Sequence, residues 1–292
     1  MKRIGLQGLA PKERKSAFQE VKLLRDLQHP HICSYRDSFV HRPTNQLCLV
    51  MTYCEGGDLH KRVQKIKKEH ARFSEARVLR WACQLALALQ YIHERHNIIH
   101  RDIKTQNIFV REDDSLMLGD FGVSRVLDSP TDLANTCVGT PFYMCPELMR
   151  KQRYSNKADM WALGCVLYEL TTLRHAFDAN DMQGLAMKIV RGRYPPLPGC
   201  YSANLHSLVE ELLHTKAPRR VSTRHWAQLA GRGARLECGG RDGSRAAGGS
   251  RVAVGWQERG RRGGSRRRPP TECSHGLRLL PKPHTISTSP QS

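Results

Sequence analysis

HRDIKTQN at residues 100–107 and DFG at residues 120–122 decide the fold of this chain, and Asp120 lies 13 positions after Asn107. The two stretches supply two carboxylates, one amide and one ammonium group: Asp102, Asp120, Asn107 and Lys104. Carboxylate and amide oxygens are the hard ligands that Mg²⁺ prefers in proteins. A lysine beside a carboxylate neutralises charge on a phosphate while the carboxylate faces an incoming hydroxyl. These residue types therefore predict a site that holds a divalent cation and a phosphate group next to a carboxylate.

Three further motifs follow in a fixed order. They are GTP at residues 139–141, CPE at 145–147 and DMWALG at 159–164. With these motifs added, the chain resembles the protein kinases. The resemblance implies an α+β fold of the bilobal kinase type, with a truncated antiparallel sheet in the N-lobe, a mainly helical C-lobe and a disordered tail.

The catalytic loop has the serine/threonine-kinase form, because Lys104 stands two residues after Asp102. Several stretches are similar to the NimA-related kinases: LLRDLQHPHI (23–32), LCLVMTYCEGGDL (47–59), HRDIKTQNIF (100–109), GDFGVSRVL (119–127) and TCVGTPFYMCPEL (136–148). The resemblance covers roughly residues 2–220. It implies that the chain transfers the γ-phosphate of ATP, with Mg²⁺, to serine or threonine hydroxyls of protein substrates.

The resemblance also implies a role for each matching residue. Asp102 would be the base, Lys104 would stabilise charge, and Asn107 and Asp120 would bind the metal, with Asp120 also contacting the nucleotide. The remaining nucleotide contacts would come from the gatekeeper Met51, the hinge residues Thr52, Tyr53 and Cys54, and Asp58. Thr52 stands where a glutamate is usual, and we expect adenine binding to survive because the hinge works through main-chain groups.

Two threonines and one arginine are implied to have regulatory roles. Thr136 lies where the family carries its activating phosphothreonine, and Arg101 would pair with the added phosphate. An ordinary loop threonine is the alternative for Thr136. Thr140 would instead contact Asp102 and Lys104.

The N-terminus predicts a phosphate clamp formed by Lys2 and Glu20. Their separation of 18 residues fits the family's lysine-to-glutamate distance, and apolar residues recur at helical intervals behind Glu20. A solvated terminal lysine is the alternative. No G-x-G-x-x-G motif precedes Lys2, so we expect an N-lobe of about three strands, weak nucleotide binding, and an exposed sheet that a partner could cover.

Composition limits the remaining possibilities. The chain has 292 residues, of which 39% are apolar, enough for one large domain and a tail. No apolar run approaches the roughly 20 residues that span a membrane. Ten cysteines without a C-x-x-C pair indicate reduced thiols. We expect a cytoplasmic or nuclear protein, and the resemblance adds the centrosome and the cilium.

Periodicity and turn signals predict the order of elements. We expect helices at 14–28, 58–69, 74–95, 159–173 and 203–214, and strands at 47–54, 107–110 and 115–119. The resemblance implies that the helix beginning at Asp159 anchors the catalytic loop from below, and that Arg220, or else Arg219, pairs with Glu147. The predicted domain boundaries are an N-lobe at 1–50, a hinge at 51–54, a C-lobe at 55–218 and a tail at 219–292.

The tail is strongly basic. It holds 16 Lys and Arg against four Asp and Glu, so +12 of the formal charge of +20 lies there. Its Gly, Arg, Ser and Pro content predicts disorder, and non-standard ends at both termini suggest an alternative transcript product. The tail could bind nucleic acid or another polyanion, or be a solvated tail without a partner. For the whole chain, the alternative to an active kinase is a catalytically silent kinase-fold protein that binds partners.

Overall fold

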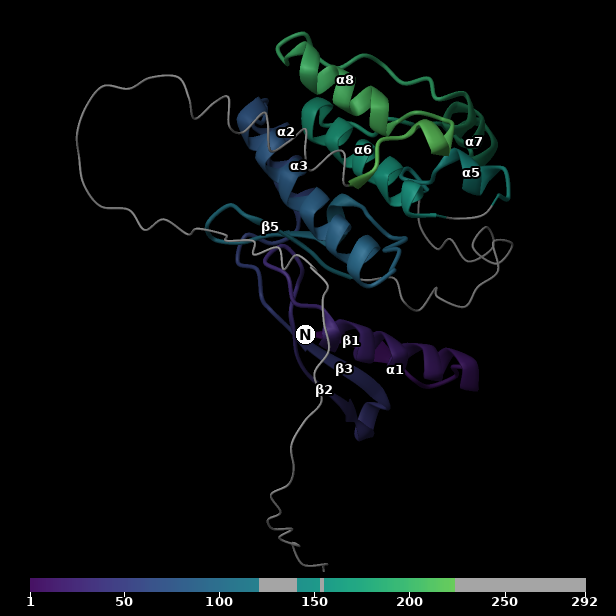
Figure 1. Ribbon diagram of the computed structural model, residues 1–292. Helices are drawn as coiled ribbons and strands as arrows, with labels where there is room; N and C mark the ends of the chain where they lie inside the picture. The colour runs from purple at the N-terminus through teal and green to yellow at the C-terminus, as the bar shows by residue number, and fades with distance from the viewer. Residues whose placement is uncertain (121–140, 153–154, 224–292) are drawn as a thin grey trace, which may run out of the picture. The chain divides into compact units, whose positions relative to one another are not determined.

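The computed structural model describes residues 1–120, 141–152 and 155–223. Figure 1 shows a small sheet with one helix beside it, followed along the chain by a mainly helical part. The strands are β1 (Lys2–Gly5), β2 (Tyr35–His41), β3 (Gln46–Met51), β4 (Ile108–Val110) and β5 (Leu116–Leu118). The helices are α1 (Pro11–Asp26), α2 (Leu59–Lys68), α3 (Glu75–Gln90), α5 (Pro146–Met149), α6 (Asn156–Thr172), α7 (Met182–Arg191) and α8 (Ala203–Leu212). The short helical turns are η1 (Arg42–Thr44), η2 (Tyr91–Arg95), η3 (Thr105–Asn107) and η5 (Ala217–Arg219).

The N-terminal sheet has three antiparallel strands, the number expected from the sequence, and their order is β1-β3-β2. Lys2 lies opposite Leu49 of the central strand β3. Leu47 and Leu49 are buried, and buried apolar side chains of α1 belong to the same core. On β2, Phe39 and Val40 are 46% and 40% exposed. The sheet therefore holds Lys2 on a paired strand.

The helices confirm the predicted periodicity, with shifts at their ends. The first helix begins at Pro11, three residues earlier than predicted, because Pro is favoured in the first turn of a helix. Ser74 caps α3 by accepting a hydrogen bond from the Arg77 N–H. The α-helical hydrogen bonds of α3 end at Gln90, and η2 continues to Arg95. We did not predict β2 or α7, whose short patterns are weaker than those of the long helices.

Helix α6 forms the centre of the helical part. Every residue from Ala158 to Thr171 is buried, so this helix is covered on all sides, and its periodic pattern is correspondingly weak. An added Cβ at Gly164 would lie 2.8 Å from the Cβ of Leu212 on α8. Glycine at this position therefore lets α6 and α8 approach closely.

The hairpin of β4 and β5 fixes the two ends of the candidate site in space. Ile108 pairs with Leu118, and the Gly119 N–H donates to the Asn107 carbonyl at 2.9 Å. The Cys33 N–H donates to the Leu118 carbonyl at 2.9 Å, which connects the segment before β2 to the hairpin. In the described part of the chain, none of the helices has the length and apolar character needed to cross a membrane.

Acid should destabilise the fold through His29. This side chain stacks on Tyr91, with ring centroids 5.1 Å apart, and burial together with the charges of His31 and Arg95 lowers its pKa from 6.5 to about 4. The unfolded chain therefore binds a proton at a higher pH than the folded chain does. The free energy of unfolding should fall as the pH drops from about 6.5 to about 4, and His29→Gln should reduce that fall in urea titrations at pH 7 and pH 5.

His41→Gln is the control for this measurement, because His41 is exposed on β2. An equal fall in unfolding free energy between pH 7 and pH 5 in the wild type and in His29→Gln would contradict the prediction.

Candidate active site

The catalytic loop is held by the buried carboxylate of Asp159 on α6. Its Oδ2 accepts from the His100 N–H at 2.8 Å and its Oδ1 from the Arg101 N–H at 3.0 Å. The Nε2 atom of His93 lies 2.7 Å from Oδ2. Arg101 has a φ of 67°, a conformation that is strained for a side chain of this kind and is maintained by these bonds. The anchoring role predicted for Asp159 is confirmed.

The ring of His100 connects the loop to the DFG segment. Burial lowers the pKa of His100, so the ring is neutral at pH 7. Nδ1 accepts from the Asp102 N–H at 3.3 Å, and Nε2 therefore carries the proton that it donates to the Gly119 carbonyl, 3.1 Å away. One uncharged side chain thus fixes the backbone at both ends of the site.

Asp102, Lys104 and Asn107 form one hydrogen-bonded group. Lys104 Nζ lies 2.9 Å and 3.1 Å from the two carboxylate oxygens of Asp102. Asn107 Nδ2 donates to Asp102 Oδ2 and to the Asp102 carbonyl, both at 2.8 Å. Because the amide nitrogen of Asn107 is used in this way, its side-chain oxygen is the atom that can face a cation.

Asp120 lies at the same end of the β4–β5 hairpin as Asn107. Its φ is 58°, and its carboxylate forms an ion pair with Lys2, which comes from β1. The structure thus brings Lys2 and Asp120 together across 118 positions of sequence. Glu20 lies on α1, but its side chain is outside the described part, so the predicted Lys2–Glu20 pair stays a prediction.

The predicted hinge follows β3. The Thr52 N–H donates to the Ser34 carbonyl at 2.9 Å, so any adenine contact at Thr52 has to use its carbonyl group. Tyr53 is 78% exposed, whereas Cys54 is buried in a small apolar cluster with Cys33, Met117 and the partly buried Phe109. These side chains connect the hinge to the β4–β5 hairpin, which lies between Asn107 and Asp120 in the sequence.

Asp58 has a structural role in addition to its predicted nucleotide contact. Its Oδ1 accepts from the Lys61 N–H at 2.8 Å and thereby caps α2. Its Oδ2 lies 3.1 Å from Lys61 Nζ. The contact with a nucleotide stays a prediction.

The predicted regulatory threonines, Thr136 and Thr140, lie outside the described residues, and so do Phe121 and Gly122 of the DFG motif. Beyond that gap the chain resumes with α5. Tyr143, just before α5, donates to the Glu169 carboxylate and lies 3.1 Å from the Thr105 hydroxyl. Burial and the charge of Glu169 raise the pKa of Tyr143, so its hydroxyl keeps its proton. Sequence reasoning missed this network, although one acidic residue in the apolar run of α6 could have indicated it.

A buried ion pair stabilises the base of the site. Arg220 donates to the two carboxylate oxygens of Glu147 from Nη1 at 2.7 Å and from Nη2 at 2.8 Å. Its side chain is 0% exposed, whereas Arg219 is exposed. Of the two arginines that the sequence left open, Arg220 is the one that pairs with Glu147.

Comparisons with known proteins agree with the motifs. The protein kinase domain family model matches residues 1–230. The chain is 48% identical to mouse "Serine/threonine-protein kinase Nek1" over 222 residues, which are 76% of this chain and 18% of that protein. It is 42% identical to mouse "Serine/threonine-protein kinase Nek4" over 77% of this chain and 28% of that protein. Human "Serine/threonine-protein kinase Nek5" is 42% identical over 76% of this chain and 31% of that protein. The chain thus spans less than a third of the length of these three relatives.

Proposed function

We propose that this chain, which belongs to the protein kinase family and within it resembles the NimA-related kinases, transfers the γ-phosphate of ATP to serine and threonine hydroxyls of proteins. The observation that carries the proposal is the group of Asp102, Lys104 and Asn107, with Asp120 and Lys2 at the adjoining end of the β4–β5 hairpin. Five polar side chains from three separate parts of the chain gather there. Side chains that only stabilise the fold would not require two cations and two carboxylates together at one partly exposed position.

Asp102 is the residue that receives the hydroxyl proton in this proposal. Its carboxylate is 24% exposed and is oriented by hydrogen bonds from Lys104 and Asn107. A carboxylate in this position orients the nucleophile and accepts its proton. Lys104 then neutralises negative charge that builds up on the transferred group.

The residues present fit a magnesium ion. The side-chain oxygen of Asn107 and the carboxylate of Asp120 are hard donors, and the amide nitrogen of Asn107 is turned away toward Asp102. A bound magnesium ion would supply positive charge to the phosphates of ATP. Lys2, which pairs with Asp120, adds a further cation on the nucleotide side.

The test is phosphate transfer from radiolabelled ATP by the purified full chain to a threonine-containing peptide. We expect incorporation that requires Mg²⁺ and is lost in EDTA. Protein carrying Asp102→Asn, purified from the same host, controls for a contaminating kinase. Absence of transfer by folded protein, with a thermal unfolding temperature that ATP and Mg²⁺ do not change, would contradict the proposal and support a kinase-fold binding protein.

A further inference from the structure

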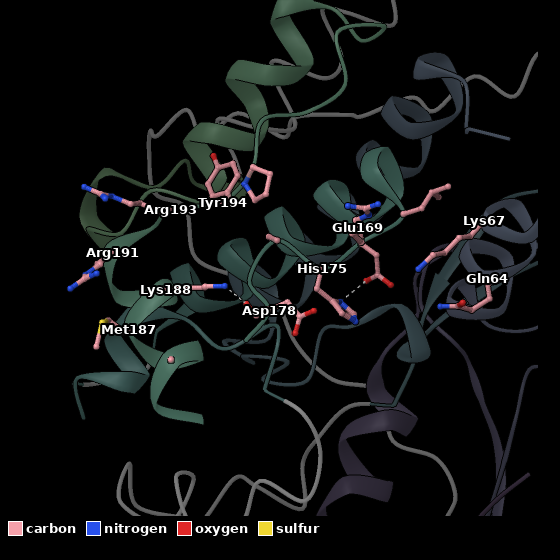
Figure 2. A pocket seen from close by; sticks show the side chains of 15 residues that line it. Gln64, Lys67, Glu169, His175, Asp178, Met187, Lys188, Arg191, Arg193 and Tyr194 are labelled. Atoms are coloured by element: carbon pink, nitrogen blue, oxygen red, sulfur yellow. Dashed lines mark hydrogen bonds and ion pairs between the residues drawn. The ribbon is translucent and has the colours of Figure 1, made fainter. Parts of the chain in front are cut away.

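An open cavity of about 1050 Å³ lies in the helical part, away from the hinge. Figure 2 shows its walls: Gln64 and Lys67 come from α2, and Met187, Lys188 and Arg191 come from α7. The segment that follows α6 forms the floor between these helices. The function proposed above assigns no role to this cavity.

The lining of the cavity is strongly basic. Five cationic side chains line it: Lys67, Arg174, Lys188, Arg191 and Arg193. All five belong to exposed residues. Only two acidic residues, Glu169 and Asp178, share the lining. Glu169 is already bound to Tyr143, and its carboxylate is only 3% exposed. The cations therefore dominate the charge that a ligand would meet.

His175 does not add to that charge at neutral pH. Its pKa is lowered mainly by burial, which outweighs the opposing effect of the Glu169 and Asp178 carboxylates. Its ring is stacked on Phe142, with centroids 4.0 Å apart. His175 thus belongs to the floor, and the cations form the rim.

The rim cations have no carboxylate partner among the described residues. Lys188 Nζ donates to the Asp178 carbonyl at 2.6 Å, a neutral acceptor. Elsewhere on α2, by contrast, Lys61 pairs with Asp58 and Lys65 with Glu69. Like charges gathered around one cavity repel each other, and an anionic ligand would relieve that repulsion.

Apolar surface lies between the cations. Met187 on α7 is 45% exposed, and Tyr194 and Pro195 also line the cavity. A flexible, exposed methionine suits the binding of an apolar side chain. Tyr194 is the one aromatic lining residue besides His175, so the cavity offers little of the base-stacking surface typical of single-stranded nucleic-acid sites.

We propose that this cavity binds an acidic, extended segment of a partner protein, with carboxylates facing Lys67 on one wall and Arg191 and Arg193 on the other. An apolar residue of the segment packs on Met187. The charge complementarity and the apolar strip carry the inference together. Binding at this place does not require phosphate transfer, so the proposal stands apart from the function proposed above.

The test measures fluorescence anisotropy of a labelled peptide built from Asp, Glu and Leu, with full-chain protein and no ATP. A peptide with Asn and Gln in place of the acidic residues is the matched probe. We expect the Arg191→Glu/Arg193→Glu protein to bind the acidic peptide about tenfold more weakly than the wild type at moderate salt. The neutral peptide should bind weakly to all proteins.

Lys15→Glu/Lys22→Glu is the control, because it makes the same charge change on exposed positions of α1. The basic tail is the same in every variant and contributes equally to peptide binding. Only the difference in peptide affinity between the two double variants therefore reports on the cavity. Lys67→Glu tests the opposite wall of the cavity. If a thermal melt shows that Arg191→Glu/Arg193→Glu does not fold, the affinity of the Lys67→Glu protein for the acidic peptide is the test.

Two results would overturn the proposal. One is equal affinity of the cavity variants and the α1 control for the acidic peptide. The other is a labelled heparin fragment that loses binding to the cavity variants as strongly as the peptide does, which would identify a general polyanion site.

Discussion

Arg220→Ala is expected to lower the free energy of unfolding by about 3–5 kcal/mol, because it leaves the buried Glu147 carboxylate without its cation. The guanidinium makes two hydrogen bonds to Glu147 and one each to the carbonyls of His214 and Lys157, both at 2.8 Å. It also lies over the Trp161 ring, 5.1 Å from its centroid. Urea unfolding of the full chain at pH 7 measures the loss.

Arg219→Ala is the matched control, since it removes an exposed neighbour of the same chemistry. Its expected effect is within about 0.5 kcal/mol of the wild type. Equal losses in the two variants would show that the pair with Glu147 does not stabilise the fold.

The loss should depend on pH. Burial alone would raise the pKa of Glu147, but the hydrogen bonds and charge of Arg220 outweigh it and hold the pKa below its usual 4.5. The pair therefore stabilises the fold above that usual value and ceases to do so as the pH falls through the lowered value. The difference in unfolding free energy between wild type and Arg220→Ala should shrink in strong acid.

The sequence predicted contacts within one local motif more readily than contacts between distant segments. Asp102, Lys104 and Asn107 lie within one loop, so their contact follows from spacing. The anchoring role of Asp159 was implied by the resemblance to the protein kinases rather than by a pattern in the sequence. Asp159 accepts from the main-chain N–H groups of His100 and Arg101, which lie 59 and 58 positions earlier in the sequence, so spacing alone does not give this contact.

Contacts between distant segments were harder to predict. The ion pair of Lys2 with Asp120 joins the first strand to the end of a hairpin, and no periodic pattern encodes it. The network of Tyr143, Thr105 and Glu169 likewise depends on tertiary packing. The basic cavity was missed because its cations are scattered between α2 and Arg193 and gather only when α7 packs near α2. In the sequence they looked like ordinary solvated charges.

Asp102→Asn is expected to reduce the rate of phosphate transfer by about 10²–10⁴-fold, the range over which a positioned general base acts. The side-chain amide of asparagine is not basic enough to accept the hydroxyl proton, and it offers one acceptor oxygen where the carboxylate of Asp102 offers two. The KM for ATP should change little, because Asp102 contacts neither the hinge nor Lys2 in the proposed mechanism. Initial rates over a range of ATP concentrations separate the two quantities.

The fold should survive this change, which makes the rate loss interpretable. The carboxylate of Asp102 is 24% exposed, so water can satisfy the donor that loses its partner, and the unfolding free energy should stay within about 1 kcal/mol. Asp26→Asn, at the exposed end of α1, is the control for a loss of negative charge. Equal transfer rates in wild type and Asp102→Asn would mean that another group takes the proton or that a contaminating enzyme does the chemistry, and titration with a purified kinase inhibitor panel would separate these two cases.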